Sequence, residues 1–416
     1  MGVYRSMAHC RRGYLGPVTG SEANSLPAYL TTATLARAAS ESAGPALLVV
    51  TVAVVGSAAT GSYLVAAMTA SAAVGGPLIG ALLDRAARPR RGFAWALATM
   101  GAGLAAIALT IGHVPMGVLL GFAVVAGFGY PAATGAWSAQ LPRLIPATSL
   151  TRAYSADAAT YSVAAVVAPP LAAALVAAST RAPLWLVVAL VISALVGLRS
   201  VPLAAASSER TTNSLLADLK SGTQVMARNV ALRRTVIITT VGFAGQAAVF
   251  VTAPVLAQEL TGSLQFTGVI LGVFAAGGVV TALWFTRHPV QRPDRMVIGT
   301  TFLSAVMLAG IGAAPTAWLL LVAAFAMGAL EPPLMSAMFL IRARESPTQV
   351  QSQIFTTSAS LRTAAFAAST AICGALITVG VGAVIAFGVG LHLVALLLGL
   401  LLGPHLPARE HWVRRD

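Results

Sequence analysis

The segment GGPLIGALLDRAARPRR, residues 75–91, ends a long uncharged hydrophobic run and begins a basic connection. Its single acid, Asp84, is followed by four arginines, Arg85, Arg88, Arg90 and Arg91. A helix needs about 20 apolar residues to cross the roughly 30 Å hydrocarbon core of a bilayer, and the run before Asp84 is long enough. The segment therefore predicts the end of a membrane-spanning helix and a charged loop at the membrane surface.

The composition of the whole chain indicates a protein that is surrounded by lipid. Of its 416 residues, 57% are hydrophobic and only 9% are charged, which excludes an ordinary soluble globule. Helices are favoured over a β-barrel because the apolar runs are continuous and do not alternate with polar residues. We expect an all-α polytopic membrane protein with twelve spans, at 28–56, 62–83, 92–112, 115–138, 154–178, 183–203, 235–258, 264–286, 295–313, 316–341, 354–378 and 381–403.

The basic residues gather on one side of this map, and all but one of the 26 are arginine. The connections on the opposite side hold only Arg181 and Glu259. The positive-inside rule therefore predicts that both termini and the large central connection are cytoplasmic. Because the arginines are spread over many connections, the net charge of +14 reflects topology, and we exclude nucleic-acid binding. Five tryptophans lie near predicted span ends, where indole rings favour the headgroup layer: Trp95, Trp137, Trp185, Trp284 and Trp318.

The sequence repeats itself at an offset of 201 residues. Thr60, Gly61 and Ser62 recur as residues 261–263, and Gly127 and Pro131 recur at 328 and 332. One register that serves several helices predicts two pseudo-symmetric six-helix bundles. The predicted domains are an N-terminal tail at 1–27, bundles at 28–203 and 235–403, a linker at 204–234 with a short amphipathic helix around Leu215, Leu216 and Leu219, and a C-terminal tail at 404–416.

The basic segment carries a family resemblance. Its residues resemble the G-x-x-x-D-R-x-G-R-R signature of major facilitator superfamily transporters, with Ala87 at the second glycine: Gly80, Asp84, Arg85, Arg88, Arg90 and Arg91. The twelve spans and the two halves resemble the same superfamily over the whole chain beyond residue 26. The resemblance implies alternating access, in which the halves rock about a cavity near the membrane midplane. It also implies a cytoplasmic gate formed by Asp84, Arg85 and Arg88, although positive-inside anchoring would explain the arginines equally well.

A second element points to the bacterial drug and metabolite exporter branch. The stretch VVAPPLAAAL, residues 166–175, is similar to the G-P-x-x-G-G pattern in the fifth helix of family members that export drugs by antiport. Ala168, Ala172 and Ala173 replace its glycines, and simple close packing is the alternative explanation. The arginine that is common in the fourth helix of proton-driven exporters is missing here.

Ionisable residues inside the predicted spans are the candidates for transport chemistry, because such charges persist mainly where function or pairing supports them. They are Arg37, Glu41, Asp157, Glu331 and Arg362. Arg37 and Glu41 share one helix face and can pair with each other. The Gly44–Pro45 step that follows predicts a break that would free backbone groups beside Glu41, as expected of a helix that lines an aqueous cavity. A cavity role and a purely structural ion pair remain alternatives for these two residues.

Glu331, which precedes two prolines, is the candidate for proton coupling or for attracting a cationic substrate, with a satisfied structural acid as the alternative. Asp157 lies about one turn into the fifth span, so a gate, a helix-end role and substrate binding are all open. The repeat places Tyr161 opposite Arg362, which predicts corresponding cavity positions in the two halves.

Neutral polar residues extend the predicted substrate and proton cavity. Tyr130, Tyr161 and Gln246 can orient a substrate, although hydrogen bonding between helices is the commoner role of such residues. His392, in the last span, is predicted to be packed or peripheral. Cys10 and Cys373 suggest neither a disulfide nor a metal site.

The sequence favours a secondary active transporter over an enzyme. The ATP-binding pattern G-x-x-x-x-G-K-S/T is absent, and Lys220 follows no glycine-rich loop. The leading prediction is a monomer in a bacterial plasma membrane that exports a small, partly hydrophobic molecule in exchange for protons, without a cofactor or metal. Import of a metabolite by proton symport is the alternative within this class. A polytopic enzyme or sensor is the alternative from another class, which the short connections disfavour.

Overall fold

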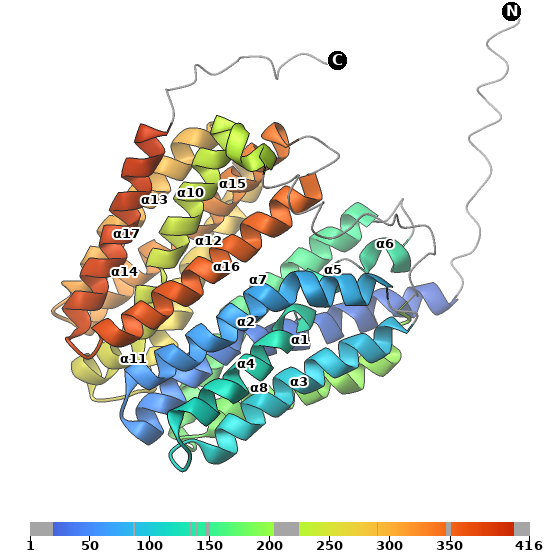
Figure 1. Cartoon of the computed structure of the whole chain (residues 1–416), viewed down its shortest axis with the longest axis horizontal. Helices are drawn as coiled ribbons and strands as arrows, with labels where there is room; N and C mark the ends of the chain where they lie inside the picture. The colour runs from blue at the N-terminus through green and yellow to red at the C-terminus, as the bar shows by residue number, and fades with distance from the viewer. Residues whose placement is uncertain are drawn as a thin grey trace, which may run out of the picture.

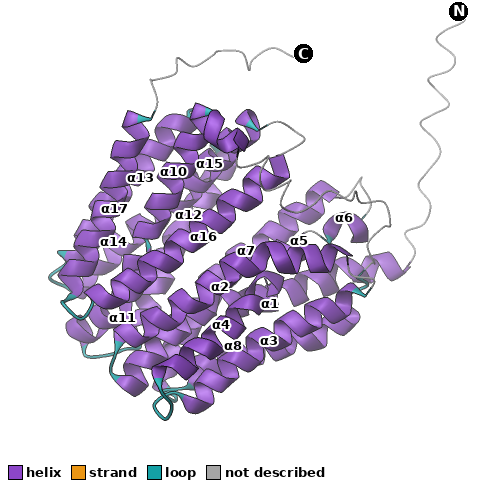
Figure 2. Ribbon diagram, in the orientation of Figure 1, coloured by secondary structure: helices purple, strands orange, loops and turns teal. Residues whose placement is uncertain are grey.

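The computed structural model describes residues 20–85, 88–133, 135–138, 140–145, 150–203, 224–288, 290–346 and 351–402. Every regular element within these ranges is helical (Figure 2). Twelve segments are long and apolar enough to cross a membrane, which agrees with the predicted number. The predicted amphipathic helix of the linker and both tail ends lie outside the described residues.

The helices form two bundles that lie side by side (Figure 1). The first bundle contains α1 (Gly20–Val55), α2 (Ala58–Arg85), α3 (Pro89–Thr110), α4 (Met116–Ala133), α5 (Gly135–Ser138), α6 (Leu141–Leu144), α7 (Leu150–Ala174) and α8 (Ala182–Gly197), with 3₁₀ turns after α7 (Leu175–Ala177) and α8 (Leu198–Ser200). The second contains α10 (Val230–Gly245), α11 (Ala247–Thr261), α12 (Phe266–Arg287), α13 (Pro293–Gly312), α14 (Ala317–Ala329), α15 (Glu331–Glu345), α16 (Gln351–Leu376) and α17 (Val381–Leu401). Each bundle encloses its own buried apolar cluster.

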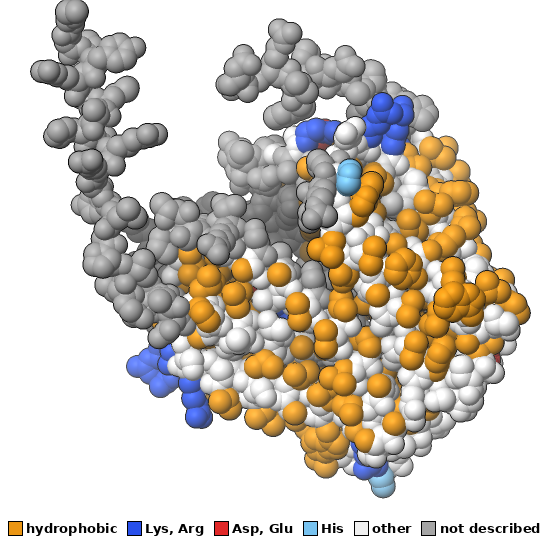
Figure 3. Space-filling model, turned by 180° about the vertical axis from the view of Figure 1, so that it is seen from behind, with side chains coloured by type: hydrophobic (Ala, Val, Ile, Leu, Met, Phe, Trp, Pro, Cys, Tyr) orange, Lys and Arg blue, Asp and Glu red, His pale blue; other side chains and the backbone are white. Residues whose placement is uncertain are grey.

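The outer surface is apolar, as expected of helices that face lipid. Hydrophobic side chains are spread over the face in Figure 3, and the blue groups of lysine and arginine lie at its edges. Trp95 and Trp318 are 75% and 72% exposed. The prediction that Trp137 lies in the headgroup layer is wrong, because α5 directs its ring into the first core. There the ring packs 5.7 Å from that of Tyr29 and 4.9 Å from that of Phe93, between centroids.

The sequence repeat corresponds to one helix pair that is built twice. In the first bundle α4 crosses α2 where Gly127 faces the carbonyl oxygen of Met68. In the second bundle α14 crosses α12 where Gly328 faces the carbonyl oxygen of Phe274. A methyl group at either glycine would overlap the backbone of the neighbouring helix. Glycine therefore permits the same close approach in both halves.

Within the described residues, two spans are interrupted near their middle. The seventh divides at Gln246 and the tenth at Leu330, so that Glu331 begins α15. The expected break at Gly44–Pro45 is wrong: α1 runs without interruption from residue 20 to 55. Membrane helices tolerate an internal proline where neighbouring groups satisfy the freed backbone, and α1 is packed among other helices. The position equivalent to Pro45 in the repeat is Gln246, where the seventh span does break.

The two bundles meet along α2 with α16 and along α7 with α12. The twelve spans bring the start of α1 and the end of α17 to one side of the molecule, here called the terminal side, and we call the opposite side the far side. A methyl group at Gly374 would lie 2.8 Å from Cβ of Ser62, and one at Gly268 would lie 2.6 Å from the carbonyl oxygen of Pro170. All four residues lie in the far-side ends of their helices. The bundles are thus in tight contact on the far side.

Candidate functional site

A buried ion pair joins α1 and α7 in the first bundle. Nη1 of Arg37 lies 2.8 Å from Oδ1 of Asp157, and the two side chains are 0% and 5% exposed. The hydroxyl groups of Tyr29 and Ser138 each donate a hydrogen bond to this carboxylate at 2.6 Å. The guanidinium also lies 3.7 Å from the centroid of the Tyr161 ring, in cation–π geometry. These contacts hold Asp157 and Arg37 in one arrangement.

The same arginine binds further groups of the first bundle. Nη1 donates to the Asp157 carbonyl oxygen at 2.8 Å and to the hydroxyl of Thr160, and Nη2 donates to Ser138 at 3.0 Å. The predicted pairing of Arg37 with Glu41 is not formed, because the guanidinium is turned toward α7. Asp157 is buried and not at a wet helix end, so the geometry favours a structural role, and its predicted gating role stays a prediction.

Glu41 is half-buried and faces the space between the two bundles. Glu331, from the second bundle, lines the same space, which has a volume of about 250 Å³. Apart from the two carboxyl groups, its walls are apolar or formed by glycine and proline: Ala165, Val166, Pro169, Phe250, Leu271, Phe274, Ala275, Gly278, Val279, Ala282, Gly328 and Pro332. We call this space the interbundle cavity. An apolar cavity with few polar groups is typical of small-molecule sites.

Glu331 also contacts a polar group of its own bundle. Nε2 of Gln246 donates a hydrogen bond to its carboxylate. The breaks in the seventh and tenth spans place Gln246 before α11 and Glu331 at the start of α15. Two predicted site residues, which are 85 positions apart, are therefore in direct contact.

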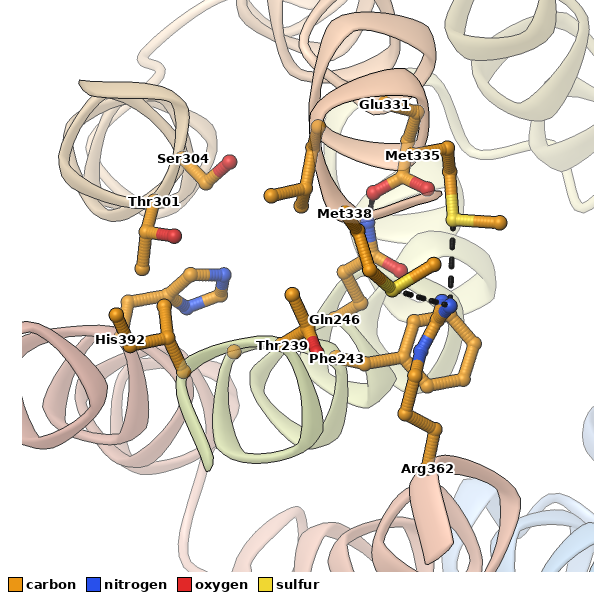
Figure 4. A pocket seen from close by; sticks show the side chains of 13 residues that line it. Thr239, Phe243, Gln246, Thr301, Ser304, Glu331, Met335, Met338, Arg362 and His392 are labelled. Carbon is orange, nitrogen blue, oxygen red and sulfur yellow. Dashed lines mark hydrogen bonds between the residues drawn. The ribbon is translucent and has the colours of Figure 1, made fainter. Parts of the chain in front are cut away.

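Arg362, from α16, lies near Glu331 but forms no ion pair with it within 4.0 Å. Its guanidinium stacks over Phe243 at 4.3 Å from the ring centroid. Nη1 is 3.2 Å from the sulfur of Met335 and 3.5 Å from that of Met338 (Figure 4). Arg362 thus has soft, uncharged partners within the part of the chain that the structure describes.

The repeat relates the remaining predicted residues to this pair. Tyr130 occupies the position equivalent to Glu331, and Tyr161 the position equivalent to Arg362. Tyr130 lies close enough to Glu41 for electrostatic interaction. The first bundle therefore carries two tyrosines where the second carries an acid and a base. Glu41 supplies the acid that faces the cavity from the first bundle.

His392 belongs to a site that the sequence did not predict. Its ring is 2% exposed, its Nδ1 lies 2.8 Å from the Gly388 carbonyl oxygen, and it lines a narrow pocket with Thr301, Ser304 and Arg362 (Figure 4). The structure thus confirms a packed histidine and excludes a peripheral one. Tyr29 and Ser138, which bind Asp157, were also missed, since single hydroxyl groups are common in helices and give no distinctive pattern.

The predicted gate is only partly visible. Asp84 and Arg85 end α2, but their side chains lie outside the described residues. Arg88 is exposed and precedes α3. The cytoplasmic gate formed by these residues therefore stays a prediction.

Two six-helix bundles with a shared cavity and ionisable groups inside the spans define a polytopic membrane transporter. The chain belongs to the Major Facilitator Superfamily, whose family model matches residues 29–368. This membership points to a transporter, a class that is generally not enzymatic, and it supports secondary transport of a small molecule.

Solved transporter structures share this fold at low sequence identity. The crystal structure of the nucleoside transporter NupG (D323A mutant) has 10% identity and a TM-score of 0.77, over 92% of this chain and 100% of that chain. A POT family transporter in complex with thioalcohol conjugated peptide has 13% identity and a TM-score of 0.68, over 91% of this chain and 95% of that chain. A POT family transporter in complex with 5-aminolevulinic acid has 13% identity and a TM-score of 0.67, with the same coverage of 91% and 95%. No curated protein matches the sequence.

Proposed function

We propose that the protein is a proton-coupled exporter that moves a small, partly hydrophobic molecule through the interbundle cavity by alternating access. The observation that carries this proposal is that Glu41 and Glu331, one from each bundle, line one otherwise apolar cavity. The arginine distribution supports a cytoplasmic location of the terminal side, by the positive-inside rule. The tight far-side contacts of the two bundles then correspond to a state that is closed toward the outside.

The two carboxyl groups supply the coupling chemistry. A carboxyl group in an apolar site can hold either a proton or the positive charge of a substrate, and the two compete for it. Glu331 is also bound by Gln246, which belongs to the break in the seventh span. A change of its protonation state therefore alters a contact between the breaks of the seventh and tenth spans. Glu331 is the proposed binding site for the proton, and Glu41 is the proposed binding site for the substrate.

The test is transport by the purified protein in lipid vesicles under an imposed pH gradient. Ethidium, a small aromatic cation, is the probe for exchange against protons. We expect gradient-driven ethidium movement that falls at least tenfold in Glu331→Gln and persists in Glu259→Gln, which changes an exposed acid of α11. Undiminished movement in Glu331→Gln would remove this residue from the coupling mechanism.

Import by proton symport is the second candidate, because one structural neighbour is a nucleoside transporter. Uridine is the probe for this alternative in the same vesicles. Uridine movement in the direction of the proton gradient, without ethidium exchange, would establish symport in place of export. A wild-type protein that moves neither probe under a pH gradient would contradict the proposed substrate class.

A further inference from the structure

One face of α15 carries a row of unusual side chains. Glu331, Met335, Met338 and Arg342 are spaced by four, three and four residues, which places them on one side of a helix. The guanidinium of Arg362 lies against the two sulfur atoms in the middle of this row. Arg342 follows Met338 by one helical turn, toward the terminal side.

Positive charge on this face is not balanced by the described residues. Arg342 is 1% exposed, and its Nε and Nη2 have no hydrogen-bond partner among them. Nε of Arg362 is likewise buried and unpartnered. The two arginines are close enough to repel each other. The nearby acid, Glu331, attracts Arg362 without forming an ion pair and is bound by Gln246.

This arrangement is costly unless an anion completes it. A charge inside a protein or a membrane costs several kcal/mol when it is neither paired nor hydrogen-bonded. Methionine sulfur atoms and the Phe243 ring hold Arg362 in place, but they carry no negative charge. Among the described residues, three buried nitrogen atoms of the two guanidinium groups therefore lack an acceptor: Nε and Nη2 of Arg342 and Nε of Arg362.

We propose that a small oxyanion, either a carboxylate or a phosphate group, binds between the guanidinium groups of Arg342 and Arg362. Guanidinium groups bind such anions through paired N–H donors and keep their charge under all physiological conditions. The anion accepts from Nε and Nη2 of Arg342 and from Nε of Arg362. It also competes with Glu331 for Arg362, which links anion binding to the carboxyl group that faces the interbundle cavity.

The anion has two possible sources with the same chemistry. It is either the anionic end of a transported molecule, an assignment that rests on the proposed function, or a free anion from the terminal side. Arg342 lies near the terminal-side end of α15, so both sources reach it from that side. The experiment below distinguishes them.

The first measurement is thermal unfolding of the full-length protein in detergent, followed by tryptophan fluorescence. Inorganic phosphate or succinate replaces chloride at constant ionic strength. We expect at least one of them to raise the Tm of the wild type and of Arg344→Gln by about 2 °C or more. Arg344 is the matched control because it is on the same helix but is exposed and paired with Asp294 and Glu345. The shift should disappear in Arg342→Gln and in Arg362→Gln.

The second measurement is direct binding of radiolabelled phosphate or succinate, which can also be made on variants whose thermal unfolding cannot be followed. Arg342→Lys keeps the charge but loses the paired donors, so we expect it to bind about tenfold more weakly than the wild type. In vesicles without a pH gradient, label that exchanges across the membrane identifies a transported anion, and label that binds without exchange identifies a free one. Absence of binding in the wild type, or binding unchanged in both glutamine variants, would overturn the site. Binding needs no proton gradient, so this result is independent of the coupling test on Glu331.

Discussion

The guanidinium of Arg37 lies 2.8 Å from the carboxylate of Asp157, although 120 positions separate the two residues. Both are buried, and the carboxylate also accepts hydrogen bonds from Tyr29 and Ser138. The pair therefore connects α1, α5 and α7 inside the first bundle. Its position away from the interbundle cavity favours a role in holding the bundle together.

Removing one partner of this pair should destabilise the protein strongly. Asp157→Asn leaves the Arg37 charge buried without a counter-charge, a change that typically costs about 3–5 kcal/mol. We expect a lower Tm and a smaller folded fraction in size-exclusion chromatography. The double variant Arg37→Met with Asp157→Leu should recover much of the loss, because it leaves no unpaired charge.

The control is Arg344→Gln, which breaks an exposed ion pair with Asp294. Exposed pairs contribute about 0–1 kcal/mol, so its Tm should remain close to that of the wild type. A double variant as unstable as Asp157→Asn would show that the surrounding hydroxyl network, and not the charge, determines the stability.

The repeated glycines give a second stability prediction. Gly127→Ala should destabilise the protein by about 1–3 kcal/mol, since its methyl group would overlap the backbone of α2. Gly328→Ala should have a similar effect through α12. Thermal unfolding measures both. Gly121→Ala, on the same helix as Gly127, meets no atom within 4 Å and should be neutral or slightly stabilising. Equal Tm values for Gly127→Ala and Gly121→Ala would contradict the close crossing.

The fold could be predicted from the sequence because lipid imposes simple requirements on it. Each span must be apolar over its whole length, and each must satisfy its backbone internally. The offset that aligns Gly127 with Gly328 then identified the duplication, and both glycines perform the same packing task. Trp137 was misplaced because hydropathy does not reveal that α5 turns this residue inward.

The candidate site was predictable only as a set of residues. Charges within spans are rare, so Arg37, Glu41, Asp157, Glu331 and Arg362 stood out. The contact partners of these residues could not be predicted from the sequence, because a spacing rule relates only neighbours on one helix. That rule suggested Glu41 for Arg37, whereas the bundle supplies Asp157 from another helix.

Filling the interbundle cavity should block transport without unfolding the protein. Ala275 lines this cavity from α12, so Ala275→Phe would occupy the space between Glu41 and Glu331. We expect at least a tenfold loss of ethidium or uridine transport in vesicles, with a nearly unchanged Tm. Val280→Phe is the control, because Val280 is on the same helix but is 56% exposed. Full transport by Ala275→Phe would place the substrate path elsewhere.

Alternating access requires the far-side contact between α2 and α16 to open. Ser62 and Gly374 approach each other there, and cysteines at these positions should form a disulfide after a small adjustment, because Cβ atoms in disulfides are about 3.8 Å apart. In a background with Cys10 and Cys373 replaced by serine, oxidation of the Ser62→Cys, Gly374→Cys variant should stop transport. Reduction should restore it.

The disulfide should hold the protein with its far side closed, and the accessibility of the interbundle cavity shows whether this state has been trapped. With the far side closed, a cysteine at position 41 should still react with a membrane-impermeant thiol reagent from the terminal side. The reason is that the interbundle cavity lies on the terminal side of the closed contact. Labelling before and after oxidation, read by mass spectrometry, tests this directly. A control variant with Gly382→Cys in place of Gly374→Cys should not cross-link, because a Cβ atom at Gly382 would have no atom of a neighbouring helix within 4 Å among the described residues. Transport that continues at its full rate in the oxidised variant would show that these two helices need not separate, and it would exclude rocking of the bundles about this contact.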